Sequence, residues 1–335
     1  MKKRPLLFDW AITKECNLNC LHCRGMTRAE LPKSLILKVA HELVELKPEW
    51  VIIEGGEPLT RKGIWEVFSI LTTGGLDVSM ITNGTLLTEE NMVKLLKLGV
   101  GIQISIDSPY PEIYEKLRRG AKFQQVTETA KQLAKTGKLH AINFVLSKDN
   151  YKSIPDMFKL AKDINAGLIN IIGLKPTKSY KTKLLSSEEY KEAILMTTES
   201  SGKYGVDFFF DEPFFKAACK EWGVGQKDTG KKSRIVVSEK NGCVFGEYLF
   251  MEPNGDLKPC TFANYVVGNA KEGIINVWEK LLNSEFILNI NKKTNRKGIC
   301  VECKHLDICG GCRSRAYALT NDWLESDIVC PIKDL

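Results

Sequence analysis

The sequence lacks any apolar run close to the roughly 20 residues that a membrane-spanning helix needs. Its first residues, Met1-Lys-Lys-Arg-Pro5, lead into an apolar stretch with neither the length nor the cleavage site of a secretory signal. Internal repeats and low-complexity segments are also missing. These absences exclude the membrane-spanning and secreted classes, and they make a cytoplasmic protein the expectation.

A strong excess of one charge is missing as well. The chain has 48 Lys and Arg residues against 41 Asp and Glu residues, so its net charge is only +7 over 335 residues. This excess does not predict a nucleic-acid-binding surface, but it suits an acidic electron donor such as a ferredoxin or flavodoxin, or a substrate with carboxylates. The 43% hydrophobic content suffices for one large domain or two unequal ones.

Cysteine, in contrast, is abundant, with 11 residues, and in a reducing compartment these are expected to be metal ligands rather than disulfides. Cys16, Cys20 and Cys23 lie in one loop after the apolar run 8–12. A [4Fe–4S] cluster normally takes four thiolates, so three local ligands would leave one iron open to a substrate or cofactor. A zinc site usually draws ligand pairs from two separated loops, and no second pair lies near this one.

Residues 8 to 175 alternate short β-rich runs with amphipathic helical patterns. The predicted strands are 8–12, 50–53, 77–81, 101–106, 140–146 and 168–172, and the predicted helices are 34–46, 63–72, 88–98, 124–135 and 153–164. Six βα units in sequence predict an α/β fold with a parallel sheet, and six fall short of the eight that close a barrel. We therefore expect a partial (β/α)6 TIM-like barrel that is open on one side.

Polar motifs follow several of these strands, at the edge where βα folds collect their chemistry. Glu54-Gly55-Gly56-Glu57-Pro58 follows the second strand, where the glycines would let the backbone approach a ligand and Glu57 could bind an ammonium group. An ordinary turn is the alternative. Ser105 and Asp107 point the same way on the fourth strand and could meet ribose hydroxyls, unless Asp107 only caps the next turn.

Three further segments suggest roles more weakly. Four lysines of the loop 175–183 could receive substrate carboxylates, or the loop could simply be solvated. The aromatic run 208–215 predicts a packing seam between two domains or, alternatively, a wall facing the substrate. The Gly- and Lys-rich segment 223–233 predicts a mobile loop.

The last third of the chain holds a second cysteine set. Its members are Cys243, Cys260, Cys300, Cys303, Cys309, Cys312 and Cys330. Asn254-Gly255 between two β-rich runs predicts a hairpin that would bring Cys243 near Cys260, and a helix is predicted over 274–288. By spacing alone, zinc and iron–sulfur clusters are equally compatible with this set.

In its Cys-x3-Cys-x2-Cys loop and its Gly-Gly-Glu-Pro segment, the chain resembles the radical S-adenosylmethionine (SAM) superfamily. The resemblance implies that Cys16, Cys20 and Cys23 hold a [4Fe–4S] cluster whose open iron chelates the amino and carboxylate groups of SAM. The cofactor-binding residues that it implies are Gly55, Gly56, Glu57, Pro58, Asn83, Ser105, Asp107, Arg119, Asn143 and Leu174. A surface role for Arg119 is the alternative.

The second cysteine set resembles the SPASM extension of that superfamily, although Cys309-x2-Cys312 has a gap where three residues are also common. The resemblance implies one auxiliary [4Fe–4S] cluster on Cys300, Cys303, Cys309 and Cys330, and another on Cys243, Cys260 and Cys312, which makes three clusters in all. Three alternatives remain for the second cluster: Cys219 could be its fourth ligand, the cluster could keep an open iron able to contact the substrate, or Cys219 could be a buried free thiol. The expected domains are a barrel (1–185), a bridging region (186–242) and a SPASM domain (243–335).

The resemblance implies an enzyme that cleaves SAM reductively to a 5′-deoxyadenosyl radical, which takes a hydrogen atom from a substrate. No general base is needed, so none is assigned. A peptide or protein side chain is the first expectation for the substrate, although the barrel begins too early for a leader-binding domain, which a separate protein would supply. The alternatives are decarboxylation of tetrapyrrole propionates, maturation of a tungsten or molybdenum pterin cofactor, and, without catalysis, an iron–sulfur electron carrier or zinc-stabilised binding module.

Overall fold

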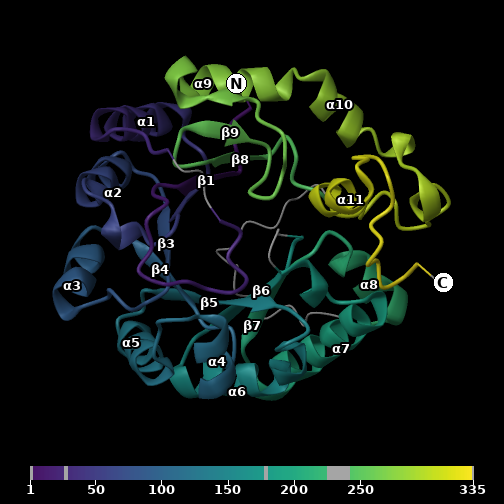
Figure 1. Cartoon of the computed structure of the whole chain (residues 1–335), viewed down its shortest axis with the longest axis horizontal. Helices are drawn as coiled ribbons and strands as arrows, with labels where there is room; N and C mark the ends of the chain where they lie inside the picture. Colours follow the sequence, from purple (N-terminus) through teal and green to yellow (C-terminus); the bar gives the residue numbers. More distant parts are fainter. Residues whose placement is uncertain (1–2, 26–28, 177–179, 225–241, 334–335) are drawn as a thin grey trace.

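A computed structural model describes residues 3–25, 29–176, 180–224 and 242–333. Its strands form a single sheet with the order β10-β9-β8-β1-β2-β3-β4-β5-β6-β7. The sheet curves around the inside of the molecule, and most helices lie outside it (Figure 1). In the described part of the chain, no helix has the length and apolar character needed to cross a membrane.

The predicted parallel partial barrel is confirmed, because β1 to β6 pair in sequence order and in parallel. These strands are β1 (Leu7–Ala11), β2 (Trp50–Glu54), β3 (Val78–Thr82), β4 (Gly101–Ser105), β5 (Leu139–Leu146) and β6 (Leu168–Gly173). Two further parallel strands extend the sheet: β7 (Asp207–Asp211), which the sequence did not predict, lies beside β6, and β8 (Tyr248–Met251), the first strand of the predicted hairpin, lies beside β1. The sheet therefore includes chain from all three expected domains.

The strands are buried on both faces, as expected for a parallel sheet covered by helices. All five residues of β4 are buried, and Ile102 and Ile104 belong to the main hydrophobic core. Residues of the other face are polar and bind one another across strands: Asn170 donates to Gln103 at 3.1 Å and to Asn143 at 2.7 Å. The barrel thus has an apolar outer face and hydrogen-bonding side chains on the inner face.

Amphipathic helices cover the outer face (Figure 1). They are α1 (Lys33–Leu46), α2 (Ile64–Thr73), α3 (Glu89–Lys97), α4 (Pro111–Leu117), α5 (Phe123–Lys135), α6 (Ile154–Ile164) and α7 (Ser187–Tyr204). In α5, for example, Val126, Ala130 and Leu133 are buried at helical spacing. The sequence analysis missed α4, which is only seven residues long and begins at a proline.

The aromatic run 208–215 supplies β7 and the start of α8 (Phe215–Trp222), and its Phe214 also lies under Arg315 of the C-terminal part, at 5.4 Å. Phe208 packs edge-on against Phe158 of α6 at 6.2 Å, and Phe210 stacks on Phe215 at 5.2 Å. Aromatic residues favour strands and pack well against helices, so they complete the barrel at this edge. Most of the loop predicted over 223–233 lies outside the described residues.

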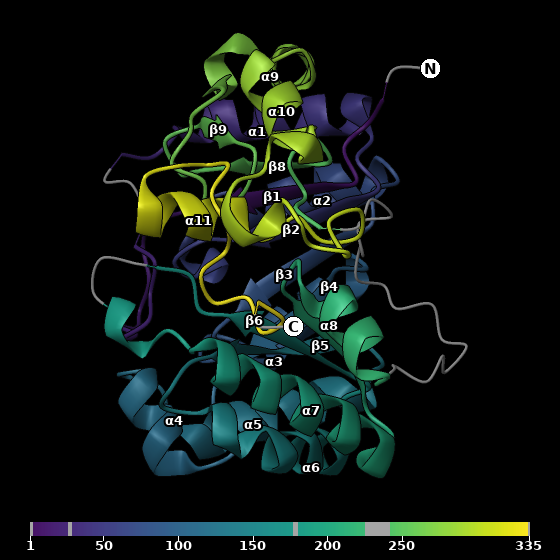
Figure 2. The same cartoon turned by 90° about the vertical axis from the view of Figure 1, so that its right-hand side faces the viewer.

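The C-terminal part returns to the first strand of the barrel (Figure 2). The predicted hairpin at Asn254-Gly255 is present, since β8 pairs antiparallel with β9 (Asp256–Lys258), which in turn pairs with β10 (Gly268–Asn269). The helix predicted over 274–288 is divided into α9 (Ile274–Leu282) and α10 (Glu285–Asn291). The last helix, α11 (Arg313–Thr320), follows directly after Cys312.

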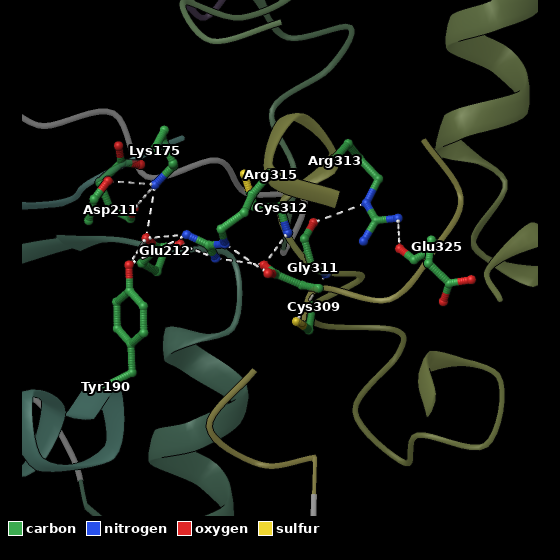
Figure 3. A network of polar contacts seen from close by, with 12 residues as sticks. Lys175, Tyr190, Asp211, Glu212, Cys309, Gly311, Cys312, Arg313, Arg315 and Glu325 are labelled. Carbon is green, nitrogen blue, oxygen red and sulfur yellow. Dashed lines mark hydrogen bonds and ion pairs between the residues drawn. The ribbon is translucent and has the colours of Figure 1, made fainter. Parts of the chain in front are cut away.

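A buried ion-pair network joins α11 to the end of β7 (Figure 3). Arg315 is fully buried, and its guanidinium binds Glu212 through two nitrogens at 2.8 Å and Asp327 at 2.6 and 2.8 Å. Glu212 also accepts hydrogen bonds from Tyr190 and Lys175, both at 2.9 Å. The neighbouring cations hold the pKa of Glu212 down at about 2 although burial opposes this, so the carboxylate stays charged.

We expect Arg315→Met to lower the free energy of unfolding by about 3–5 kcal/mol, because it leaves two buried carboxylates without their main cation. Lys297→Met is the matched control, since it removes only an exposed ion pair to Asp322 and should leave the free energy of unfolding almost unchanged. Anaerobic urea unfolding followed by circular dichroism measures both. An equal, small loss in the two variants would show that the network does not join α11 to the barrel.

Candidate functional site

The three-cysteine loop leaves the sheet at the carboxyl end of β1. Cys16 and Cys23 are exposed and Cys20 is half-buried. Backbone N–H groups already point at two of the sulfur atoms, from Leu18 to Cys16 and from Gly25 to Cys23, both at 3.4 Å. Such N–H donors stabilise thiolates bound to iron, so the loop has donors in place for a cluster.

The residues of this loop fit a multinuclear cluster. Burial raises the pKa of the Cys20 thiol to about 11, and the neighbouring Cys23 and Cys16 add to this shift, so the three sulfur atoms lie near one another. Within the described ranges, no three His, Cys, Asp or Glu side chains are close enough to hold one metal ion. The thiolates of a [4Fe–4S] cube bind separate iron atoms, so a cube accepts sulfur atoms that lie farther apart than the ligands of one zinc ion.

The Gly-Gly-Glu-Pro segment supports the base of this loop. The N–H of Gly56 donates to the carbonyl of Thr13 at 2.7 Å, and the N–H of Glu57 donates to that of Glu15 at 2.8 Å. A Cβ atom on Gly56 would lie 2.2 Å from the Glu15 carbonyl oxygen. The glycine is thus required for contact between two backbone segments. The sequence analysis had assigned the close approach to a ligand.

Glu57 is fully buried and points toward β3. Its carboxylate accepts hydrogen bonds from the Thr82 hydroxyl at 2.9 and 3.0 Å and from the Asn83 N–H at 2.9 Å. Asn83 in turn donates to Asn17 in the cysteine loop at 3.0 Å. The side chain of Glu57 therefore orders the cysteine loop through β3, while cofactor contacts by residues 55–58 stay a prediction.

Asp107, two residues after the end of β4, anchors the same loop. Its carboxylate accepts from Arg118 at 2.6 Å, pairs with His22 at 3.1 Å and accepts from the N–H of Val145 at 2.9 Å. Arg118 and His22 hold the pKa of this fully buried carboxyl well below its ordinary value. His22, between Cys20 and Cys23, was missed by the sequence analysis because its partner is 85 residues away, a distance that no local pattern spans.

The structure distinguishes the two adjacent arginines. Arg118 is buried against Asp107, whereas Arg119, the predicted cofactor contact, is exposed, and its carbonyl accepts from the Asn19 N–H at 3.1 Å. The other predicted contacts lie at the carboxyl edge of the sheet. Ser105 and Asn143 are register partners on β4 and β5, and Leu174 directly follows β6; all three are buried.

The lysine loop differs from the expectation. Lys175 is buried and bound to Glu212 at 2.9 Å, and Lys183 binds Asp149 at 2.7 Å, so both already have carboxylate partners. Lys181 is exposed, and Lys178 lies outside the described residues. The loop therefore does not present four free cations to a substrate.

A second polar group, which the sequence analysis missed, lies on the inner face between the cysteine loop and the C-terminal hairpin. We call it the inner polar cluster; it comprises Asp9, Arg24, Glu54, Tyr248, Glu252, Lys258 and Thr261. Arg24 binds Glu54 at 2.8 Å and Glu252 at 3.4 Å, and Lys258 binds Glu252 at 2.8 Å. Its members come from five separate segments, so no motif could reveal it.

The inner polar cluster has hydrogen-bonding capacity left over. Tyr248 donates to Asp9, whose pKa is raised well above its ordinary value by burial and by Glu54. One oxygen of Asp9 and one of Glu252 are buried with no hydrogen-bond partner among the described residues. Arg24 also lies over the ring of Phe250 at 4.6 Å. A buried acceptor without a donor is costly, which indicates a polar ligand for this surface.

Four C-terminal cysteines line one cavity of about 600 Å³. These are Cys300, Cys303, Cys309 and Cys330. The cavity wall also includes His305 and Asp327, and the N–H of Gly311 donates to the sulfur of Cys309 at 3.3 Å. A cavity lined by four thiols, with an N–H donor at one of them, fits a fully ligated [4Fe–4S] cluster.

The remaining thiols form a second group of three. Cys243 and Cys312 both raise the pKa of Cys260, which burial raises further, to about 12. Cys219 lies apart in α8, and burial alone raises its pKa, to about 11. The structure thus groups the cysteines into sets of three, four and three with Cys219 separate, while their ligand roles stay predictions.

Comparison with known proteins agrees with this geometry. Residues 10–161 match the model of the radical SAM superfamily, and residues 243–304 match that of the SPASM iron–sulfur cluster-binding domain. An AdoMet-dependent heme synthase of Methanosarcina barkeri is 30% identical over 98% of this chain and 97% of its own length. A mycofactocin maturase of Mycolicibacterium smegmatis is 26% identical over 93% and 79%.

A solved structure supports the fold. Streptococcus suis SuiB bound to S-adenosylmethionine superposes with a TM-score of 0.78 at 19% identity, covering 98% of this chain and 78% of SuiB. At this identity the likeness concerns the fold alone.

We expect Gly56→Ala to lower iron incorporation at the three-cysteine loop, because the new methyl group would collide with the Glu15 carbonyl and displace the loop. Gly202→Ala in α7 is the control: no atom lies near its added methyl group, and a helical Gly→Ala change should stabilise by about 0.5–1 kcal/mol. Iron analysis and EPR of the reduced proteins measure the effect. Full iron incorporation in Gly56→Ala would contradict the proposed packing role.

Proposed function

Because the chain belongs to the radical SAM superfamily and has a SPASM domain, we propose that it oxidatively decarboxylates propionate side chains of a tetrapyrrole. The observation that carries this proposal is the 30% identity to an AdoMet-dependent heme synthase over nearly the whole length of both chains. Two other heme synthases match at 27% and 28% identity over 97% and 98% of this chain. On the strength of this similarity we propose a tetrapyrrole in preference to the peptide substrate that the sequence analysis ranked first.

The proposed reaction balances. When bound, the cluster at Cys16, Cys20 and Cys23 and its SAM supply a radical that removes one hydrogen atom from an unreactive carbon. The propionate then loses CO2 and one electron, and a vinyl group remains. Cys243, Cys260 and Cys312 would hold the acceptor of that electron, since Thr261 of the inner polar cluster directly follows Cys260.

The residues of the inner polar cluster have the chemistry to orient such a substrate. Arg24 and Lys258 keep 15% and 17% of their side chains exposed, so a substrate carboxylate can reach both cations. Glu54 and Glu252, which these cations now bind, would then accept hydrogen bonds from water instead. We propose that this surface, between two cluster sites, binds the propionates.

Peptide modification is the second candidate. The 26% identity to the mycofactocin maturase favours it, and the excess of carboxylates over cations in the inner polar cluster would also suit basic or amide donors of a peptide. The cofactor content that we propose, three [4Fe–4S] clusters and SAM with an acidic ferredoxin or flavodoxin as electron donor, is the same for both.

We expect the anaerobically reconstituted protein to bind about twelve irons per chain and to convert an iron tetrapyrrole with propionate groups when dithionite and SAM are added. Each converted side chain should lower the tetrapyrrole mass by CO2 and two hydrogens, with one 5′-deoxyadenosine released, as mass spectrometry can measure. The variant with Cys16, Cys20 and Cys23 all changed to alanine is the control. Release of 5′-deoxyadenosine without any change in the tetrapyrrole would contradict the assigned substrate.

We further expect Lys258→Met to raise the KM for the tetrapyrrole about tenfold, more than it lowers kcat, since it removes one charge-assisted hydrogen bond to a carboxylate. Lys280→Met is the matched control, because Lys280 is an exposed lysine of α9 paired with Glu272. Steady-state kinetics separates the two variants. An unchanged KM in Lys258→Met would exclude this lysine from substrate binding.

A further inference from the structure

Arg296 is a buried cation beside the cavity of the four thiols. Only 5% of its surface is exposed. Its Nε donates to the carbonyl of Gly310 at 3.1 Å, between Cys309 and Cys312, while Nη1 is buried with no hydrogen-bond partner among the described residues. A buried N–H donor without an acceptor is energetically costly, so we expect an acceptor for Nη1 that the described residues do not supply.

The charge of Arg296 acts on thiols of both auxiliary sets. Cys243 belongs to the set of three, Cys300 and Cys309 belong to the set of four, and all three favour the charged guanidinium. Burial and the neighbouring Arg313 oppose it and lower its pKa to about 10. The side chain is therefore still a cation at neutral pH.

Arg313, two residues after Gly311, is a second buried arginine with an N–H group that lacks an acceptor. It is fully buried, and it donates to the carbonyls of Gly311, Trp323 and Glu325, yet its Nη2 has no hydrogen-bond partner in the described part of the chain (Figure 3). Neither Arg296 nor Arg313 makes an ion pair with a carboxylate of the described residues, in contrast to Arg315, which has two.

Two buried arginines that make no direct ion pair with a carboxylate favour a further source of negative charge close by. The thiolates of the two neighbouring sets are the candidates. Free thiols are neutral, whereas thiolates bound to iron are deprotonated, so bound clusters would supply that charge. Arg296 and Arg313 would therefore have anionic neighbours only when both thiol sets carry clusters.

We propose that Arg296 is a shared electrostatic positioning residue, whose charge and free N–H stabilise the reduced form of both auxiliary clusters. The proposal rests on the cluster content given under the proposed function. Reduction adds one negative charge to a cluster, and cations and N–H donors near its sulfur atoms raise the reduction potential. One arginine would thus set the potentials of two electron-transfer sites together.

The test uses the full chain with Cys16, Cys20 and Cys23 changed to alanine, so that only auxiliary clusters contribute to the spectrum. Arg296→Gln removes the charge and keeps an N–H donor for Gly310, and Arg296→Lys keeps the charge. Lys297→Gln is the matched control, because it removes the charge of the next residue, which is exposed and bound to Asp322 at 2.6 Å. Anaerobic redox titration followed by EPR, with iron and sulfide analysis, measures each protein without any substrate.

We expect Arg296→Gln to lower the reduction equilibrium constant of both auxiliary clusters about tenfold, equivalent to about 59 mV for a one-electron couple. Arg296→Lys and Lys297→Gln should match the parent protein. Loss of iron from Arg296→Gln but not from Arg296→Lys would also support the proposal, since the two variants differ in charge.

Three results would overturn it: unchanged potentials in Arg296→Gln, a shift of only one cluster, or equal loss of iron from Arg296→Gln and Arg296→Lys. Equal loss would mean that the arginine only holds the Gly310 turn. If the parent protein itself bound no iron at the two auxiliary sets, the proposed cluster content would be wrong, and this outcome is separable from the three above.

Discussion

Strand β1 is hydrogen-bonded on both sides, to β2 through Leu7–Ala11 and to β8 through Leu7–Trp10, and the arrangement of the candidate site depends on this double pairing. Because both neighbours run parallel to β1, their carboxyl ends meet at the same edge. The three-cysteine loop leaves β1 at that edge, and the hairpin that leads to Cys260 follows β8. Chain segments more than 200 residues apart in the sequence are thus brought to one opening by backbone hydrogen bonds.

Buried charged groups occur in two kinds of arrangement, one fully paired and one with hydrogen-bonding atoms left unpaired. Around Arg315, cations and carboxylates neutralise one another, and this network joins α11 to β7 with no group left unpaired at the guanidinium. In the inner polar cluster and around Arg296, in contrast, buried acceptors or donors remain without partners in the described part of the structure. The first arrangement stabilises the fold, whereas the second marks surfaces whose hydrogen bonding a substrate or cluster would complete.

The motif residues serve the loop that carries the cysteines. Gly56 permits close backbone contact with Glu15, Glu57 holds the end of β3, and Asp107 binds His22 inside the loop. A loop of eight residues with three exposed or half-exposed thiols has little apolar burial of its own, so its geometry has to be imposed by neighbours. This ordering of a catalytic loop by surrounding side chains is a general requirement for positioning a reactive cofactor.

The sequence by itself determined the class of the fold and the main cofactor chemistry. Period-2 and period-3.6 hydrophobic patterns and cysteine spacing are local properties, and they predicted β1 to β6, most of the covering helices and the hairpin at Asn254-Gly255. Only the tertiary structure decided that Arg118 rather than Arg119 faces Asp107, that Lys175 is bound to Glu212, and that Arg296 lies beside two thiol sets. Those contacts join residues far apart in the chain, and burial and pairing between distant segments leave no periodic trace in the sequence.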